Sequence, residues 1–177
     1  PGLIWVGTDD GKVHITRNHG ADWEELTANV EKAGVPHERW VARIVASKYD
    51  KASAYLAHTG YRNDDFKPYV LKTEDYGKTW VDISSNLPES PVNVIFEDKK
   101  NPALLFVGND IGVFYTLDGG GKWTQLKANI PPTIVRDLLV HPVENDLVVG
   151  TYGRAVWVGD ISPLQQMTGE VQDMPFY

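Results

Sequence analysis

Three things are scarce in this 177-residue chain, and each scarcity excludes a class of protein. There is no cysteine, which excludes disulfide bonds, thiolate metal sites and cysteine nucleophiles. No apolar run approaches the roughly 18 residues of a membrane-spanning helix, so no membrane insertion is expected. Positive charge is in deficit, with 17 Lys and Arg against 24 Asp and Glu, which argues against binding to nucleic acid.

Motifs for cofactors and metals are missing as well. The chain has no phosphate-binding loop, no GxGxxG ahead of a helix and no GxSxG. Its five histidines form neither an i, i+4 helix pair nor a zinc pattern. The run Asn63-Asp64-Asp65 offers oxygen atoms to Ca²⁺ but lacks the spacing of an EF-hand loop. We therefore expect no cofactor and no metal site.

What the chain does contain is an internal repeat. TEDYGKTW at residues 73–80 returns as TLDGGGKW at residues 116–123, and more loosely as TRNHGADW at residues 16–23. Asp or Asn can accept hydrogen bonds from nearby backbone N–H groups, Gly allows a positive φ, and Trp buries a large surface after the turn. We interpret each copy as a β-hairpin turn. The positions with these structural roles are Asn18, Gly20, Trp23, Asp75, Gly77, Trp80, Asp118, Gly120 and Trp123.

Short β-rich segments surround each turn in a fixed order, and no stretch predicts a long amphipathic helix. Only residues 24–32 favour a helix at all, and weakly. The tryptophans Trp80 and Trp123 lie 43 residues apart, a spacing typical of four-stranded antiparallel propeller blades. A sandwich or barrel would not repeat the same turn chemistry at this interval. The sequence therefore predicts an all-β fold, a partial β-propeller over residues 1–164, followed by a tail at 165–177. The expected blades are 1–34 (incomplete), 35–90, 91–133 and 134–164 (incomplete).

With these turns placed, the chain resembles the Asp-box (BNR) repeat propellers, whose turn pattern residues 73–80 fit throughout. Residues 61–69 and the ending GRAVWV at 153–158, followed by DISPL at 160–164, are similar to one subgroup. These are bacterial proteins related to sortilin-type (VPS10-like) propellers and often labelled glycosyl hydrolases. The resemblance implies the propeller fold and a secreted or periplasmic location. The turn itself is structural in these families, so it names the fold and not the function.

The expected strands number fourteen, short of four complete blades. Unpaired sheet edges and uncovered end blades favour aggregation, and repeat arrays need capped ends. We therefore expect the chain to be the C-terminal part of a larger propeller that supplies the remaining blades. Self-association that completes a ring is the alternative.

The second blade is longer than the third, and its extra residues fall almost entirely in two connections. Asn29 to Ile44 spans 15 positions where Asn86 to Ile95 spans 9, and Ala57 to Thr73 spans 16 where Val107 to Thr116 spans 9. In an up-and-down blade both connections emerge on one face, opposite the turns, and enlarged loops on one face predict a binding surface. The candidate binding residues are Arg39, Trp40, His58, Tyr61, Arg62, Asn63, Asp64, Asp65, Asp110 and Arg154. The structural alternative is that the loops only cover a neighbouring blade, and that Arg62 pairs with Asp64 or Asp65.

Aromatic side chains interleaved with carboxylates, an amide and arginine suit polar ligands. The sequence thus favours a non-catalytic interaction module that binds a polypeptide or glycan, and we assign no catalytic residue. The alternative is part of a glycoside hydrolase whose cleft is completed by other blades. Such chemistry commonly needs two carboxylates about 5 to 10 Å apart. The candidates by face are Asp9, Asp10, Asp64, Asp65 and Asp110.

Overall fold

The computed structural model describes residues 2–168 and is built from four antiparallel sheets in chain order. Sheet 1 contains β1 (Ile4–Gly7), β2 (Val13–Thr16) and β3 (Glu24–Glu25), and sheet 2 contains β4 (Trp40–Ala46), β5 (Ala54–Gly60), β6 (Asp65–Thr73) and β7 (Val81–Asp82). Sheet 3 contains β8 (Val92–Glu97), β9 (Leu105–Asn109), β10 (Val113–Thr116) and β11 (Thr124–Gln125), and sheet 4 contains β12 (Val135–Val140), β13 (Asp146–Thr151) and β14 (Val156–Asp160). Each chain segment thus pairs only with its sequence neighbours.

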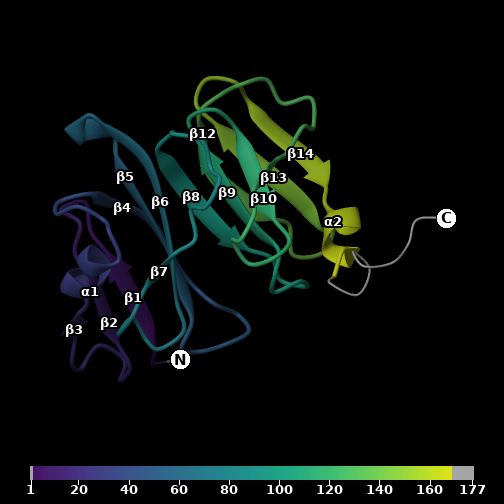
Figure 1. Cartoon of the computed structure of the whole chain (residues 1–177). Coiled ribbons are helices and arrows are strands. Elements are labelled where there is room, and N and C mark those ends of the chain that lie inside the picture. Colours follow the sequence, from purple (N-terminus) through teal and green to yellow (C-terminus); the bar gives the residue numbers. More distant parts are fainter. Residues whose placement is uncertain (1, 169–177) are drawn as a thin grey trace.

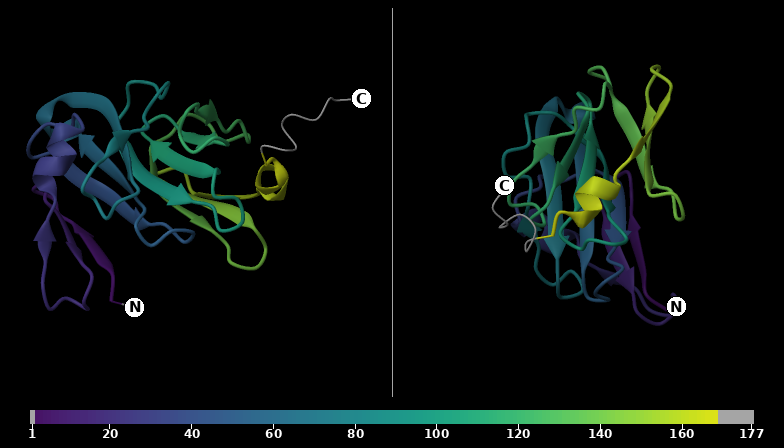
Figure 2. Two further views of the ribbon diagram at one scale, coloured as in Figure 1. Left: turned by 60° about the horizontal axis from the view of Figure 1, so that its bottom comes forward. Right: turned by 90° about the vertical axis from the view of Figure 1, so that its right-hand side faces the viewer.

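The four sheets stand side by side in an arc, which runs from purple to yellow in Figure 1. Strands β4, β8 and β12 contact one another in that order and form the inner edge. The described residues form no closed ring, as the two further views in Figure 2 also show. The chain is therefore an all-β, incomplete β-propeller, and the predicted fold class is confirmed.

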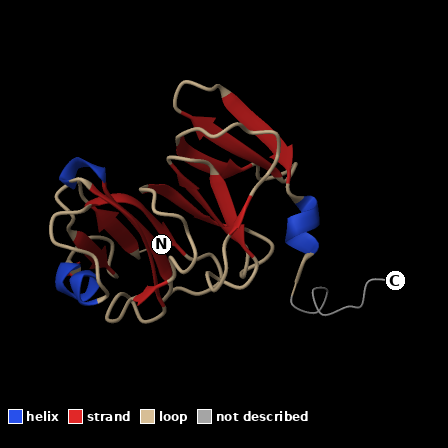
Figure 3. Cartoon of the chain, turned by 45° about the horizontal axis from the view of Figure 1, so that its top comes forward, coloured by secondary structure: helices blue, strands red, loops and turns tan. Residues whose placement is uncertain are grey.

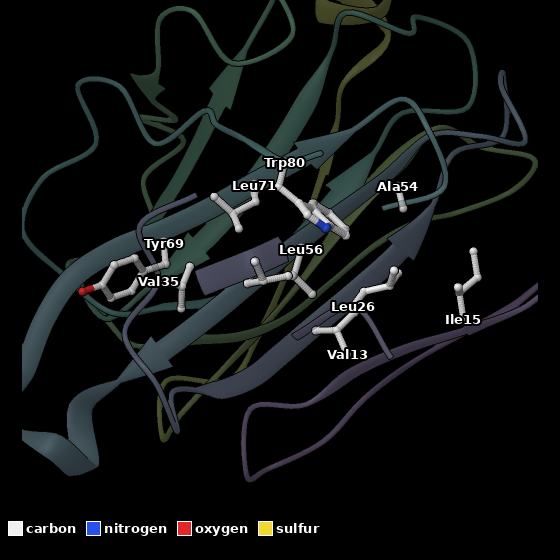
Figure 4. Close-up of a cluster of buried hydrophobic side chains, with 10 residues drawn as sticks. Val13, Ile15, Leu26, Val35, Ala54, Leu56, Tyr69, Leu71 and Trp80 are labelled. Carbon is white, nitrogen blue, oxygen red and sulfur yellow. The ribbon is translucent and has the colours of Figure 1, made fainter. Parts of the chain in front are cut away.

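The core lies between the sheets, because alternate residues of each strand point to opposite neighbours. Along β5, Leu56 packs toward sheet 1, whereas Tyr55 and Ala57 pack toward sheet 3. Figure 4 shows the first of these layers, in which Leu56, Leu71 and Trp80 gather against side chains of sheet 1. Full burial of one such side chain contributes about 1.5–3 kcal/mol. Strands β5, β8 and β9 of the two central sheets are therefore almost continuously buried.

The three repeated segments, here called the box turns (residues 16–23, 73–80 and 116–123), share one hydrogen-bond pattern. In the second, Thr73 Oγ1 donates to Asp75 Oδ1 at 2.9 Å, and the same oxygen accepts the Thr79 N–H at 2.9 Å. In the first, Asn18 Oδ1 accepts from Thr16 Oγ1 and from the Asp22 N–H, both at 2.9 Å. Partial burial opposes ionisation of Asp75, but the hydrogen bonds prevail and lower the pKa of its carboxyl.

The expectation that every box tryptophan is buried is wrong for Trp23, whose exposed fraction is 47%. Trp80 and Trp123 are buried because each packs on the preceding sheet. The Trp80 ring centroid lies 6.0 Å from that of Trp5, and Trp123 Nε1 donates to Ile83 O at 2.7 Å. No sheet precedes sheet 1 among residues 2–168, so Trp23 has no such surface to cover it.

Helices are short and lie at the margins of the strands (Figure 3). The weak helical signal at 24–32 divides into β3 and α1 (Thr27–Lys32), whose Val30 is buried. A single 3₁₀ turn, η1 (Tyr61–Asn63), follows β5, and α2 (Ser162–Gln166) follows β14. The expected start of the tail at residue 165 falls within α2, and residues 169–177 lie outside the described range. No helix in the described part is long and apolar enough to cross a membrane.

Candidate functional site

The two enlarged connections of sheet 2 reach the same end of that sheet, opposite its box turn. Trp40 pairs with Thr59 and Gly60 with Asp65 at this end, whereas Ala54 pairs with Thr73 at the other. The corresponding ends of sheets 3 and 4 carry Asp110 and the turn at residues 152–155. We call this side of the molecule the loop end and the opposite side the box end.

A half-buried ion pair joins the two connections. Arg39 Nε donates to Asp65 Oδ2 at 2.8 Å, with each side chain 17% exposed, and Tyr69 OH donates to the same oxygen at 2.9 Å. Desolvation opposes ionisation of Asp65, but the hydrogen bonds from Arg39 and Tyr69 lower the pKa of its carboxyl. Burial, followed by the hydrogen bond to Asp65, raises the pKa of Tyr69 to about 12. Asp65 is therefore ionised at neutral pH and held in place.

His58 lies beneath this pair and is almost fully buried. Its Nδ1–H donates to Arg39 O at 2.8 Å, while its buried Nε2 has no hydrogen-bond partner. Burial lowers the pKa of His58 to about 4, so the ring is neutral at physiological pH. Gly60 of β5 allows Asp65 of β6 to approach closely, because a Cβ atom on residue 60 would lie only 2.8 Å from Asp65 Cβ. His58 thus fixes the backbone at Arg39 and does not face solvent.

The exposed part of the loop end is a stack of Arg62 on aromatic rings. The Arg62 guanidinium carbon lies 3.6 Å from the centroid of the Trp40 ring, and Arg62 Nε donates to Tyr61 OH at 2.8 Å. Trp40 and Tyr61 also meet edge to face, with centroids 6.4 Å apart. The alternative that Arg62 pairs with Asp64 or Asp65 is wrong, because Arg62 lies over Trp40 while Asp65 pairs with Arg39.

The remaining residues of the second connection point to solvent. Asn63 ends η1, and Asp64 follows in the left-handed conformation with φ 55°, its N–H directed to Tyr61 O at 3.4 Å. Both side chains are exposed. The first connection, in contrast, partly covers sheet 1. The Val41 N–H donates to Thr8 O at 3.1 Å, and Val35 is buried in the layer between sheets 1 and 2. The covering role therefore applies to the first connection and not to the second.

Polar side chains that the sequence reasoning missed continue the site along the inner strands. Asn93 Nδ2 donates to Asp110 Oδ1 at 2.8 Å, and Arg136 Nη1 donates to Asn93 Oδ1 at 3.1 Å. Arg43 forms an ion pair with Asp137, which joins β4 to β12. The register shifts at the same place in all three inner strands, between Val41 and Arg43, Val92 and Val94, and Val135 and Asp137.

These bulges explain why the sequence did not reveal Asn93 and Arg136, because an extra residue in a strand redirects its side chains and breaks the alternation. Arg154 and Tyr152 are exposed at the end of sheet 4, and the Arg136 guanidinium carbon lies 5.8 Å from the Tyr152 ring centroid. Asp10, at the loop end of sheet 1, is hydrogen bonded with Thr8. Among residues 2–168, no three His, Asp or Glu side chains are arranged to hold a metal ion.

Comparisons with known proteins agree with this architecture. The family model Sortilin-Vps10 (sortilin, neurotensin receptor 3) matches residues 68–162, more than half of the chain. No curated protein matches the sequence. Among solved structures, a YCF48 bound to D1 peptide aligns with a TM-score of 0.64 at 17% identity, over 91% of this chain and 48% of that one.

Two further structures show the same fold. YCF48 from Cyanidioschyzon merolae aligns with a TM-score of 0.62 at 20% identity, over 90% of this chain and 51% of its own. The GH74 xyloglucanase from Xanthomonas campestris aligns with a TM-score of 0.64 at 14% identity, over 88% of this chain and 27% of its own. The chain thus spans about half or less of each of these structures. With its four propeller sheets and the match over residues 68–162, the chain belongs to the Sortilin-Vps10 family.

Proposed function

We propose that the loop end of sheet 2 is a non-catalytic binding surface for a polypeptide segment or a glycan. The observation that carries the proposal is the exposed Arg62 guanidinium, stacked 3.6 Å above Trp40 and hydrogen bonded to Tyr61. Stacking and the hydrogen bond orient the guanidinium without using all of its five N–H donors. Preorganised aromatic and arginine side chains carry most of the energy in many interfaces.

The layer beneath supports this role. The ion pair of Arg39 with Asp65, the hydroxyl of Tyr69 and the buried His58 fix the two connections to each other. A surface whose supporting side chains are already ordered loses less entropy on binding. Asp110 and Arg136, which are joined through the buried Asn93, extend the polar surface to the neighbouring sheets, and Arg154 extends it to the end of sheet 4.

An array experiment with a matched arginine tests the proposal. The protein is screened on a glycan array and a peptide array, and each hit is measured with wild type, Arg62→Ala and Arg17→Ala. Arg17 is the control because it also lies near an aromatic ring, Tyr76, but at the box end. Arg62→Ala should weaken binding at least about tenfold, and Arg17→Ala should leave it unchanged. Equal losses, or none, would contradict a site at the loop end.

Glycoside hydrolysis is the second candidate, because Asp64, two positions after Arg62 in the sequence, presents an exposed carboxylate at the loop end. Asp65 can serve only as a base or nucleophile, since Arg39 and Tyr69 lower the pKa of its carboxyl. Asp64→Asn and Asp65→Asn should each abolish turnover of an oligosaccharide if the site is catalytic. If it only binds, both variants change affinity, and no turnover is seen with wild type either.

We also propose that further propeller sheets, or a second copy of the chain, cover the two end faces of the arc. Sheet 1 exposes Ile4, Val6 and Trp23, and sheet 4 exposes Val156 and Val158. Apolar faces of this kind mark interaction surfaces. Light scattering over a range of concentrations distinguishes a second copy from other covering sheets, because only self-association raises the mass of this chain alone.

A further inference from the structure

The inner strands of sheets 3 and 4 each carry an extra polar residue. The register of β8 with β9 passes over Asn93, and the register of β12 with β13 passes over Arg136. A bulge of this kind redirects the side chain of the extra residue, and bulges often occur beside functional sites. The corresponding residue of β4 in sheet 2 is Ala42, which has no polar side chain. The polar pair is therefore confined to sheets 3 and 4, whereas the Arg62 stack belongs to sheet 2.

Asn93 holds two side chains of opposite charge against one amide group. The residue is 8% exposed, and its Nδ2 donates to Asp110 Oδ1 at 2.8 Å and to Val135 O at 3.1 Å. Its Oδ1 accepts from Arg136 Nη1 at 3.1 Å. Neither Asp110 nor Arg136 forms an ion pair with any residue in the range 2–168. One carboxylate oxygen and several guanidinium N–H groups are therefore held in place without a protein partner.

An aromatic ring borders this pair on sheet 4. Tyr152 is 70% exposed, and the Arg136 guanidinium carbon lies 5.8 Å from its ring centroid. The turn that carries the ring is fixed, because the Tyr152 N–H donates to Ile134 O at 2.9 Å and Thr151 Oγ1 donates to Ala155 O. Most of the ring surface is thus open to solvent beside the two charges.

The next charged residue of the same strand is not available in this way. Asp137 of β12 forms an ion pair with Arg43 of β4. The carboxylate of Asp110 and the guanidinium of Arg136 are therefore the charged groups at these bulges that remain free to bind a ligand.

The chemistry of this pair selects an uncharged group that both donates and accepts hydrogen bonds. A carboxylate only accepts, and a guanidinium only donates. An anion would be repelled by Asp110 and a cation by Arg136, while an apolar group would leave both without partners. Neighbouring hydroxyl groups of a sugar ring meet both requirements, because one donates while the next accepts. The exposed ring of Tyr152 suits the apolar C–H face of the same sugar.

We propose that Asp110, Arg136 and Tyr152 form a subsite for one pyranose unit of a neutral glycan. One hydroxyl donates to the free oxygen of Asp110, its neighbour accepts from Arg136, and the sugar ring lies against Tyr152. Asn93 positions the two charged side chains from below. The inference rests on the proposed function, since it names the ligand class of the loop end, but it concerns other side chains than the Arg62 stack. A polypeptide fits less well, because the N–H and C=O of one trans peptide group point in opposite directions.

Neutral oligosaccharides are the probe. Linear tetrasaccharides of glucose, mannose, galactose or xylose are titrated with the protein in a calorimeter, each beside its fully O-methylated counterpart, which cannot donate hydrogen bonds. We expect at least one unmodified tetrasaccharide to bind, and its methylated counterpart to bind at least about tenfold more weakly.

Two substitutions locate the binding. Asp110→Asn keeps an oxygen for Asn93 and loses the free acceptor, and Arg136→Ala removes an exposed side chain, so circular dichroism should be unchanged in both. Each should weaken binding at least about tenfold, the usual effect of a hydrogen bond to a charged group. Glu24→Gln and Arg17→Ala are the matched controls, because these residues form an exposed ion pair at the box end. Both controls should leave the affinity unchanged.

The proposal is overturned if no neutral tetrasaccharide binds, or if Asp110→Asn and Arg136→Ala both leave the affinity unchanged. Arg62→Ala separates this failure from that of the proposed function. Peptides or acidic glycans that bind through Arg62, with no binding of neutral tetrasaccharides, would overturn the subsite and leave the proposed function standing. Neutral tetrasaccharides that bind through Asp110 and Arg136, with no effect of Arg62→Ala on any ligand, would support the subsite and contradict the site on sheet 2.

Discussion

The box end and the loop end of the molecule differ in how much they vary from one sheet to the next. At the box end, three turns use the same hydrogen bonds although their sequences differ, with Asn18 taking the position of Asp75 and Asp118. At the loop end, each sheet carries different side chains, and only sheet 2 has long connections on both sides. The constant turn geometry at the box end therefore leaves the connections at the loop end free to vary in length and in side chains.

The difference teaches where to look for function in a repeat fold. The polar side chains of the box turns, such as Thr73 and Asp75, bond their own backbone. Those at the loop end bond one another across connections and sheets, as Arg39 does with Asp65 and Asn93 with Arg136. The second arrangement underlies the exposed Arg62 guanidinium, which is stacked on Trp40. Variants at the two ends can test this division.

The largest expected effect on stability comes from replacing a tryptophan at each end, Trp123 at the box end and Trp40 at the loop end. Trp123→Ala removes a buried ring and a hydrogen bond to Ile83 O, and should lower the free energy of unfolding by about 3–5 kcal/mol. Trp40→Ala removes a half-buried ring at the loop end and should cost about 1–2 kcal/mol. Urea denaturation measures both, and equal losses would show that the loop end also supports the fold.

The pH dependence of stability should report the titration of His58, the buried histidine of the loop end. The folded state keeps the pKa of His58 at about 4, below its unperturbed value of about 6.5. As the pH falls, His58 is therefore protonated in the unfolded chain before it is protonated in the folded one. The contribution of His58 to stability is fully present above pH 6.5 and is lost as the pH falls toward 4. The loss should reach about 2 kcal/mol between pH 6.5 and 5.

His58→Gln is the matched variant, because it cannot titrate in this range. Unfolding curves at pH 7 and pH 5 should differ less for this variant than for wild type. A wild type whose stability is constant over this window would contradict the buried, neutral assignment of His58.

A smaller effect is expected from the acceptor of the second box turn. Asp75→Ala removes the oxygen that accepts from Thr73 Oγ1 and the Thr79 N–H, and should cost about 1–2 kcal/mol. Asp75→Asn should cost much less, because Asn18 makes the same bonds in the first turn. Thermal unfolding compares the variants. If asparagine is as harmful as alanine, the carboxylate charge, and not the oxygen geometry, maintains the turn.

The smallest effect on stability should come from the arginine of the exposed stack. Arg62→Ala loses a surface cation–π contact, which contributes about 0.5–1 kcal/mol. Arg17→Ala, near Tyr76 at the box end, should cost no more than this. Thermal melts of the two variants should nearly coincide. A clear destabilisation by Arg62→Ala alone would assign Arg62 a structural role and weaken the binding proposal.

The sequence determined the fold class because the repeat is local. The hydrogen bonds of each box turn lie within eight consecutive residues, and the strands of each sheet pair with their sequence neighbours. Such contacts need no long-range information, so the fourteen strands and their incomplete arc could be predicted from spacing alone. The enlarged connections were visible for the same reason, as extra residues between matched strands.

Only the tertiary structure decided what those residues do. Trp23 occupies the same position in its box turn as Trp80 yet is exposed, because burial depends on the preceding sheet and not on the turn. Asp64 and Asp65 are neighbours in sequence, but one faces solvent and the other pairs with Arg39, which lies 26 positions away. Asn93 and Arg136 join the site through bulges that a periodic pattern cannot reveal. The sequence alone thus determined the repeated sheets, and the way those sheets stack decided which side chains are buried, paired or free to bind.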